Sequence, residues 1–194
     1  MRVLKTLFFL LLNFNLYSYD LPTVLVEADK IIPYDSISKI EGEYLLDNYE
    51  NNLRCNTILL AAYIHTQSIG NKDMNSLGDK YAIAQVIVTR LKYKYRKCKT
   101  LQEYLPKCST TIKKGKSRYF WIDPKEYYSQ QCLIAAYNVL QGKIPIEFYV
   151  GKCSRFQNNK KCKPLSSKTH NQIKVFTHTF YESKRFLKRI NKNG

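Results

Sequence analysis

Apolar residues recur at three- and four-residue spacing in three stretches of the chain, which is typical of helices. Residues 56–67 (NTILLAAYIHTQ) have this spacing. Residues 79–95 (DKYAIAQVIVTRLKYKY) are apolar on nearly all sides, as expected for a central, buried helix. A third helix is expected from Pro124, which suits the first turn of a helix, to Gly142, which suits a helix end.

Later stretches of the chain have the alternating, β-branched and aromatic character of short strands. These stretches are EFYVG (147–151) and IKVFTHTFYE (173–182), whereas the basic stretch 96–123 is expected to be a loop. Because the helices come first and a small β-hairpin or sheet comes late, the predicted fold class is α+β with helix dominant.

The N-terminal 18 residues have the features of a secretory signal peptide. Arg2 and Lys5 precede an apolar run over residues 7–12, and Ser18 is a small residue at a suitable cleavage point. A retained membrane anchor is the alternative, but asparagines interrupt the run well short of the roughly 20 apolar residues that a span needs. We therefore expect a secreted, periplasmic or cell-envelope protein without a transmembrane segment after signal removal.

The length of 194 residues suits one domain with its own core. We expect a signal peptide at 1–18, a lead-in segment at 19–54, the domain at 55–182 and a basic tail at 183–194. The lead-in is expected to be extended at first and then amphipathic around residues 37–49.

The chain is strongly basic, with 32 Lys and Arg against 15 Asp and Glu and a formal net charge of +17. Loss of Arg2 and Lys5 with the signal peptide leaves +15. Such a charge favours polyanionic partners. For an exported protein these are teichoic acids, anionic lipids, lipopolysaccharide or peptidoglycan carboxylates, and no nucleic acid is expected. A solvated surface that keeps the protein soluble is the alternative explanation.

The cysteines are even in number and contain no Cys-x-x-Cys pair, which in an exported chain favours disulfides over zinc. Two pairs enclose the short polar loops CKTLQEYLPKC and CSRFQNNKKC. The predicted disulfides are Cys98–Cys108, Cys153–Cys162 and, from the remaining two, Cys55–Cys132. Buried free thiols are the alternative, above all for the last pair.

Aromatic residues interleaved with polar groups indicate a groove that can stack against sugar rings. They occur in RYFWID (118–123) and HTFYE (178–182), and the candidate substrate contacts are His65, Tyr119, Phe120, Trp121, His178, Phe180 and Tyr181. Core positions for the aromatic rings, and structural roles for the histidines, are the alternative. The three histidines, His65, His170 and His178, lack the helical spacing of metal ligands, so no metal and no cofactor are expected.

Taken in order, four segments resemble the SleB/CwlJ-like cell-wall hydrolases, the spore-cortex-lytic group that also has phage relatives. NTILLAAYIHTQSIG resembles the first core helix, which in the family ends in apolar-Tyr-Gly-Glu-Ala-Arg-Gly. GDKYAIAQVIVTRLK resembles the second, where Gly-x-x-Ala-Val-Ala-x-Val-x-x-Asn-Arg is usual. RYFWID resembles the Phe-Ser-Trp-type loop, and VFTHTFYE the closing His-x-Phe-Tyr strand. The resemblance covers residues 55–182 and implies a lysozyme- or lytic-transglycosylase-like fold.

The resemblance implies cleavage of peptidoglycan glycan strands by a lytic-transglycosylase reaction. In it, one glutamic acid protonates the glycosidic oxygen while the 6-hydroxyl of muramic acid attacks the anomeric carbon. Gln67 occupies the position of this glutamate, and an amide cannot donate the proton. The fallback acids are Asp73 and Asp79, or a lead-in glutamate such as Glu41 or Glu43.

Three hypotheses follow from the sequence. The first is an active, divergent hydrolase that uses another acid. The second is a non-catalytic relative, such as a phage virion or lysis component, that binds peptidoglycan or another anionic polymer. The third is a secreted basic effector or structural protein that matches the family by chance.

Overall fold

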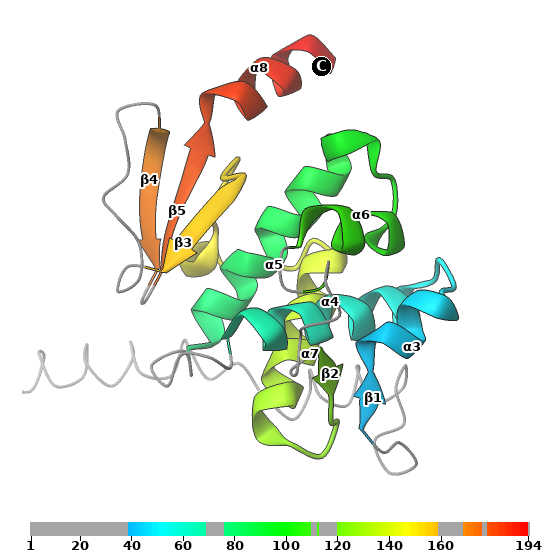
Figure 1. Ribbon diagram of the computed structural model, residues 1–194. Helices are drawn as coiled ribbons and strands as arrows, with labels where there is room; N and C mark the ends of the chain where they lie inside the picture. The colour runs from blue at the N-terminus through cyan, green and yellow to red at the C-terminus, as the bar shows by residue number, and fades with distance from the viewer. Residues whose placement is uncertain are drawn as a thin grey trace, which may run out of the picture.

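The computed structural model of the chain describes residues 39–68, 76–109, 112, 120–158, 169–175 and 178–193. Three helices form the centre of the described molecule: α4 (Leu53–Ser68), α5 (Leu77–Lys92) and α7 (Tyr127–Leu140) (Figure 1). Both α4 and α5 pack against α7. The three predicted helices are thus confirmed. Each carries fully buried side chains, such as Leu59 on α4, Ile83 on α5 and Leu133 on α7.

The ends of these helices follow from local side-chain and backbone interactions. The Asn52 side chain accepts a hydrogen bond from the Cys55 amide (2.8 Å), so α4 begins before residue 56. Pro124 lies in a turn that the Glu126 amide closes by donating to the Asp123 carbonyl (3.0 Å). The helix therefore begins after Pro124, and it ends as predicted before Gly142, whose φ is +72°.

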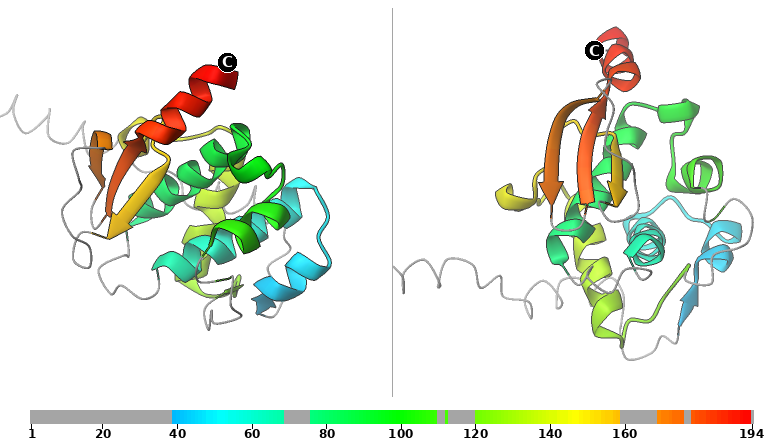
Figure 2. Two further views of the ribbon diagram at one scale, coloured as in Figure 1. Left: turned by 45° about the horizontal axis from the view of Figure 1, so that its top comes forward. Right: turned by 60° about the vertical axis from the view of Figure 1, so that its left-hand side comes forward.

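A three-stranded antiparallel sheet lies late in the chain, in the order β3 (Arg155–Asn158), β5 (His178–Ser183) and β4 (Thr169–Val175). It packs against α5, as both views of Figure 2 show. Inward-facing Phe180 on β5 is fully buried. A second pair, β1 (Ile40–Glu41) and β2 (Trp121–Ile122), is two residues long. The α+β class and the late sheet are thus confirmed.

The segment EFYVG is not a strand. It forms most of the 3-10 helix η3 (Ile146–Phe148) and the residues after it. Its backbone groups bond to one side chain on α5: the Gln85 amide donates to the Phe148 carbonyl (2.7 Å), and the Val150 amide donates to Gln85 Oε1 (3.1 Å). These bonds take the place of a strand partner.

The stretch 96–123, predicted as a loop, contains helix α6 (Leu101–Cys108) after a short 3-10 turn, η2 (Tyr95–Lys97). The Thr100 hydroxyl accepts a hydrogen bond from the Glu103 amide (3.2 Å), which caps the first turn of α6. Leu101 and Leu105 are buried. The loop prediction is therefore wrong for residues 101–108, which form an amphipathic helix with a capping residue.

Both ends of the described chain contact the rest of the fold. In the lead-in, α3 (Gly42–Asp47) packs against α4. The basic tail forms α8 (Lys184–Asn193), and its Phe186 is buried. The predicted signal peptide, residues 1–18, lies outside the described residues, among which no helix combines the length and apolarity needed to cross a membrane.

The five cysteines that the structure describes are thiols, and Cys162 lies outside the described residues. Cys55 lies in the first turn of α4 close to Tyr49, whereas Cys132 lies on α7 close to Lys80. Both are buried as thiols in the structure, which favours the alternative of buried thiols for this pair. The thiols of Cys98 and Cys108 are neighbours, and burial together with Cys98 raises the pKa of Cys108. Their pairing stays a prediction, as does that of Cys153 with Cys162.

Candidate functional site

A buried imidazole in the last turns of α4 brings three segments of the chain together. His65 has no exposed surface. Its ring centroid lies 4.3 Å from that of Trp121 on β2 and 5.5 Å from that of Tyr128 on α7. Its Nε2 atom lies 3.7 Å from Glu126 Oε2. The packing of α4 in the core holds His65 in place, and Glu126 at the start of α7 provides the neighbouring carboxylate.

Glu126 occupies the N-cap position of α7. Its Oε2 accepts a hydrogen bond from the Ser129 hydroxyl (2.8 Å), and its backbone carbonyl accepts one from the Gln130 amide (2.9 Å). Its side chain is 41% exposed. The carboxyl group is thus held at a fixed place while one side of it stays open to an incoming molecule.

Glu126 is not among the site residues expected from the sequence. The available signal was an acidic residue just after Pro124, where a helix was expected to start and where acidic side chains are favourable. That position alone is ordinary for a glutamate. Only the packing of α7 against α4 brings it to His65.

Trp121 is partly buried at the edge of this cluster. Its backbone pairs with Glu41 across the two-residue ladder of β1 and β2. The Lys39 ammonium lies 4.7 Å from its ring centroid, and the same ammonium is 3.1 Å from Glu41 Oε1. The indole therefore stands between a buried imidazole and a solvent-exposed ion pair, where a sugar ring can reach part of it.

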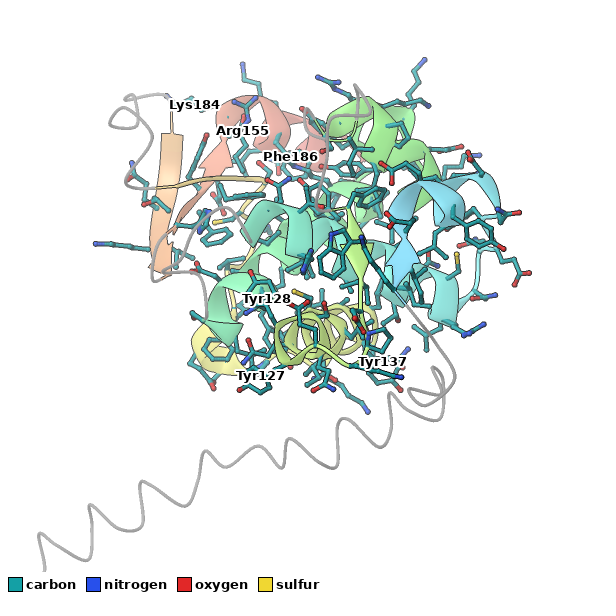
Figure 3. All side chains as sticks on the ribbon, turned by 60° about the horizontal axis from the view of Figure 1, so that its bottom comes forward. Tyr127, Tyr128, Tyr137, Arg155, Lys184 and Phe186 are labelled. Carbon is teal, nitrogen blue, oxygen red and sulfur yellow. The ribbon has the colours of Figure 1, made fainter. Side chains whose placement is uncertain are left out.

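Lys80 extends the cluster to α5. The residue is fully buried, and its Nζ donates to Gln131 Oε1 on α7 (2.7 Å) and lies 4.2 Å from the ring centroid of Tyr128. Burial lowers the pKa of Lys80, an effect that Cys132 and Asp79 oppose. Tyr128 thus contacts both His65 and Lys80, whereas its neighbour Tyr127 is 64% exposed (Figure 3).

Asp79 and His178 form a second, fully enclosed pair that joins the start of α5 to β5. His178 Nδ1 lies 3.4 Å from Asp79 Oδ1, and both residues are buried. Asp79 was expected as a fallback acid and His178 as a substrate contact. Neither role fits this geometry, because the two side chains face each other and not the solvent.

Gln67 lies in the last turn of α4, two residues after His65, and is partly buried. The preceding Thr66 hydroxyl donates to the Ala62 carbonyl (2.8 Å). The carboxamide is partly accessible to solvent, and because residues two apart on a helix do not face each other, it points away from the side of α4 that carries His65. Asp73, the other fallback acid, lies outside the described residues.

The structure corrects the expected role of two aromatic residues. Phe120 and Phe180 are fully buried, so neither can touch a substrate in this structure. Phe120 packs against Gly42, and the ring of Phe180 lies 5.8 Å from that of Phe156. Tyr119 lies outside the described residues, and Tyr181 on β5 is partly buried. Glu41 and Glu43 are exposed on the lead-in, where Glu41 forms an ion pair with Lys39.

In the part of the chain that the structure describes, no group of three His, Cys, Asp or Glu side chains could hold a metal ion. Comparison of the whole chain with protein-family models, with curated proteins and with solved structures finds no match. The resemblance to cell-wall hydrolases therefore rests on the four sequence segments alone.

Proposed function

We propose that the protein cleaves the glycan strands of peptidoglycan and that Glu126 is its general acid. The observation that carries the proposal is the place of the Glu126 carboxyl group, which is partly exposed and lies 3.7 Å from the buried His65 imidazole, a ring that itself packs against Trp121. A glycosidase acid needs such a position, open to the substrate on one side and enclosed on the other. The resemblance to cell-wall hydrolases and the helix-dominated α+β class support the choice of glycan.

The reaction needs one carboxyl group, because the substrate supplies the nucleophile. The protonated Glu126 gives its proton to the glycosidic oxygen as the bond between that oxygen and the anomeric carbon breaks. The 6-hydroxyl oxygen of muramic acid forms the new bond to the anomeric carbon, and its proton passes to the Glu126 carboxylate. The acid is thereby restored, and the products are a free 4-hydroxyl and an anhydro sugar.

His65 acts on this reaction as a positioning residue. Its 3.7 Å separation from Glu126 exceeds a hydrogen bond, and such contacts commonly shorten when substrate binds. Gln67, whose amide cannot titrate, serves as a hydrogen-bonding group for the sugar on the same helix end.

A non-catalytic, polymer-binding function is the second candidate. It is favoured by Gln67, because the resemblance places the family's acid at that position. The two functions share the same glycan and differ only in whether a bond is broken.

The test is incubation of the purified chain with peptidoglycan sacculi, followed by mass spectrometry for anhydro-muropeptides. We expect the chain to release them, and Glu126→Gln to lower the rate about 10²–10⁴-fold. Glu147→Gln, an exposed glutamate on η3, is the matched control and should cleave like the parent. Full activity of Glu126→Gln would overturn its role as the acid. Binding to sacculi without any cleavage would overturn the hydrolase in favour of the binding function.

A further inference from the structure

The C-terminal helix α8 is anchored to a distant part of the chain by one aromatic side chain. Phe186 is buried, and its ring centroid lies 5.8 Å from that of Tyr93 and 6.1 Å from that of Tyr95. Tyr93 follows the end of α5, and Tyr95 begins η2. Two segments that are about ninety residues apart in sequence thus lie side by side.

Both segments are basic, and neither residues 92–102 nor residues 184–193 include an acidic residue. Lys184 and Lys188 stand two residues to either side of Phe186, so they point away from its contact with the tyrosines. We name the exposed basic residues of the two segments the α8–η2 basic surface: Lys92, Lys94, Arg96, Lys97, Lys99, Lys184 and Lys188.

The backbone at η2 and at the residue before it adopts an unfavourable conformation. Lys94, Arg96 and Lys97 have φ values of +48°, +53° and +64°, in the left-handed region that residues with a Cβ seldom adopt. The Arg96 guanidinium donates to the Lys107 carbonyl (2.6 Å) and ties the turn to α6. Left-handed residues of this kind are often associated with function.

We propose that the α8–η2 basic surface binds a wall polymer of the poly(glycerol phosphate) type. The surface offers seven exposed cations to a linear chain of phosphates, and these are its charge complement. An anionic membrane fits less well, because no large apolar side chain that the structure describes as exposed lies on α8 or at 92–99. A single-stranded nucleic acid also fits less well, because Phe186 and neighbouring cations cover Tyr93 and Tyr95, which could otherwise stack on bases.

This surface is separate from the candidate catalytic cluster. In Figure 3, Phe186 and Lys184 lie at one side of the molecule, and Tyr128 lies at the start of α7 on another. Binding of the phosphate polymer therefore does not require cleavage of glycan. The choice of a wall polymer as the source of the phosphates does rest on the proposed wall-directed function.

The test compares two variants that lose the same charge. The surface variant carries Lys94→Asn, Lys97→Asn, Lys184→Gln and Lys188→Gln, because asparagine tolerates the left-handed turn. The control variant carries Lys125→Gln, Lys143→Gln, Lys152→Gln and Lys174→Gln, which are exposed lysines elsewhere. Circular dichroism and thermal unfolding establish that both are folded like the parent.

Affinity for purified poly(glycerol phosphate) is then measured over a range of salt concentrations. We expect the surface variant to bind at least about tenfold more weakly and to lose about three units of the slope of log K against log salt. The control variant should stay within about twofold of the parent, since its charges lie off the surface. Equal weakening in both variants would overturn the proposal, because net charge alone would then explain binding.

Parallel measurements distinguish the source of the anion. Duplex DNA, polyglutamate and vesicles with anionic lipid are titrated under the same conditions, and we expect weaker binding to each. Stronger binding to any of them, lost in the surface variant, would overturn the assignment to a wall polymer. Sacculi stripped of teichoic acid separate the two proposals: there the surface variant should cleave glycan as fast as the parent, whereas Glu126→Gln should not.

Discussion

The ring of Phe120 occupies the space that a Cβ atom on Gly42 would need. An added Cβ would lie 2.4 Å from two carbons of that ring, and the Gly42 amide donates to the Phe120 carbonyl (2.8 Å). The lead-in thus closes onto the segment that carries Trp121 through a contact that only glycine allows.

Gly42→Ala should therefore destabilise the protein by about 1–3 kcal/mol, as overpacking of a core commonly does. Urea unfolding measures this loss, and Glu43→Ala, at the next and exposed position, is the control. Phe120→Leu should offset part of the Gly42→Ala effect in the double variant, because the smaller side chain makes room. Simple additivity of the two changes would contradict the contact.

His65→Gln should slow glycan cleavage, because the glutamine leaves Glu126 without the imidazole that lies 3.7 Å away. If His65 acts through Glu126, the double variant His65→Gln with Glu126→Gln should be no slower than Glu126→Gln alone. Rates of muropeptide release measure this. Multiplied losses in the double variant would mean that the two residues act independently.

Gln67→Glu should place a carboxyl group where the resemblance puts the family's acid and raise cleavage. General acid catalysis is commonly worth about 10²–10⁴-fold, so the carboxyl group should restore activity even in a Glu126→Gln background. Gln67→Asn, which shortens the side chain and keeps the amide, is the control. If the glutamate has no effect in either background, the resemblance has placed the family's acid at the wrong residue.

Stability should fall as the pH rises above the ordinary tyrosine range. Burial raises the pKa of Tyr104 to about 12, against the effect of the Arg90 guanidinium. The unfolded phenol therefore loses its proton first, so the contribution to stability is complete below pH 10 and is lost between pH 10 and 12. For Tyr104 this amounts to about 2–3 kcal/mol.

Urea unfolding between pH 9 and 11.5 should thus show a shallower fall for Tyr104→Phe than for the parent. Exposed Tyr149→Phe should follow the parent. Burial lowers the pKa of Lys80, so this residue makes stability rise with pH below its ordinary pKa. Both proteins contain Lys80, so its effect does not change the difference between their curves. Parallel curves for Tyr104→Phe and the parent would show that another group causes the loss of stability at alkaline pH.

Cys98 and Cys108 should form a disulfide when the chain is exported as the predicted signal peptide implies, since the thiol of Cys98, just before α6, is a neighbour of the thiol of Cys108 at the end of α6. Closing a loop of this size is worth about 3 kcal/mol in the chain-entropy description. Peptide mapping without reductant should recover the linked peptides, and thermal unfolding should show lower stability on reduction. Buried Cys132 should label with iodoacetamide only after unfolding. Labelling of Cys98 in unreduced, unfolded protein would rule the disulfide out.

The pattern of apolar residues by itself determined the helices α4, α5 and α7 and the late strands β4 and β5. Each has a periodicity that is complete within one segment, so the burial of its own face is enough to predict it. The helix α6 was also open to prediction, because Thr100 and Glu103 have capping-box spacing before buried Leu105, whereas the cysteines on either side favour a loop closed by a disulfide.

Tertiary structure alone decided where the chemistry of the chain lies. It enclosed Asp79 with His178, buried Phe120 and Phe180 in the core, and brought Glu126 to His65. These side chains come from segments far apart in sequence, and whether they meet depends on how helices and strands pack. Periodicity states which face of an element is buried, but not which residue of another element it is buried against.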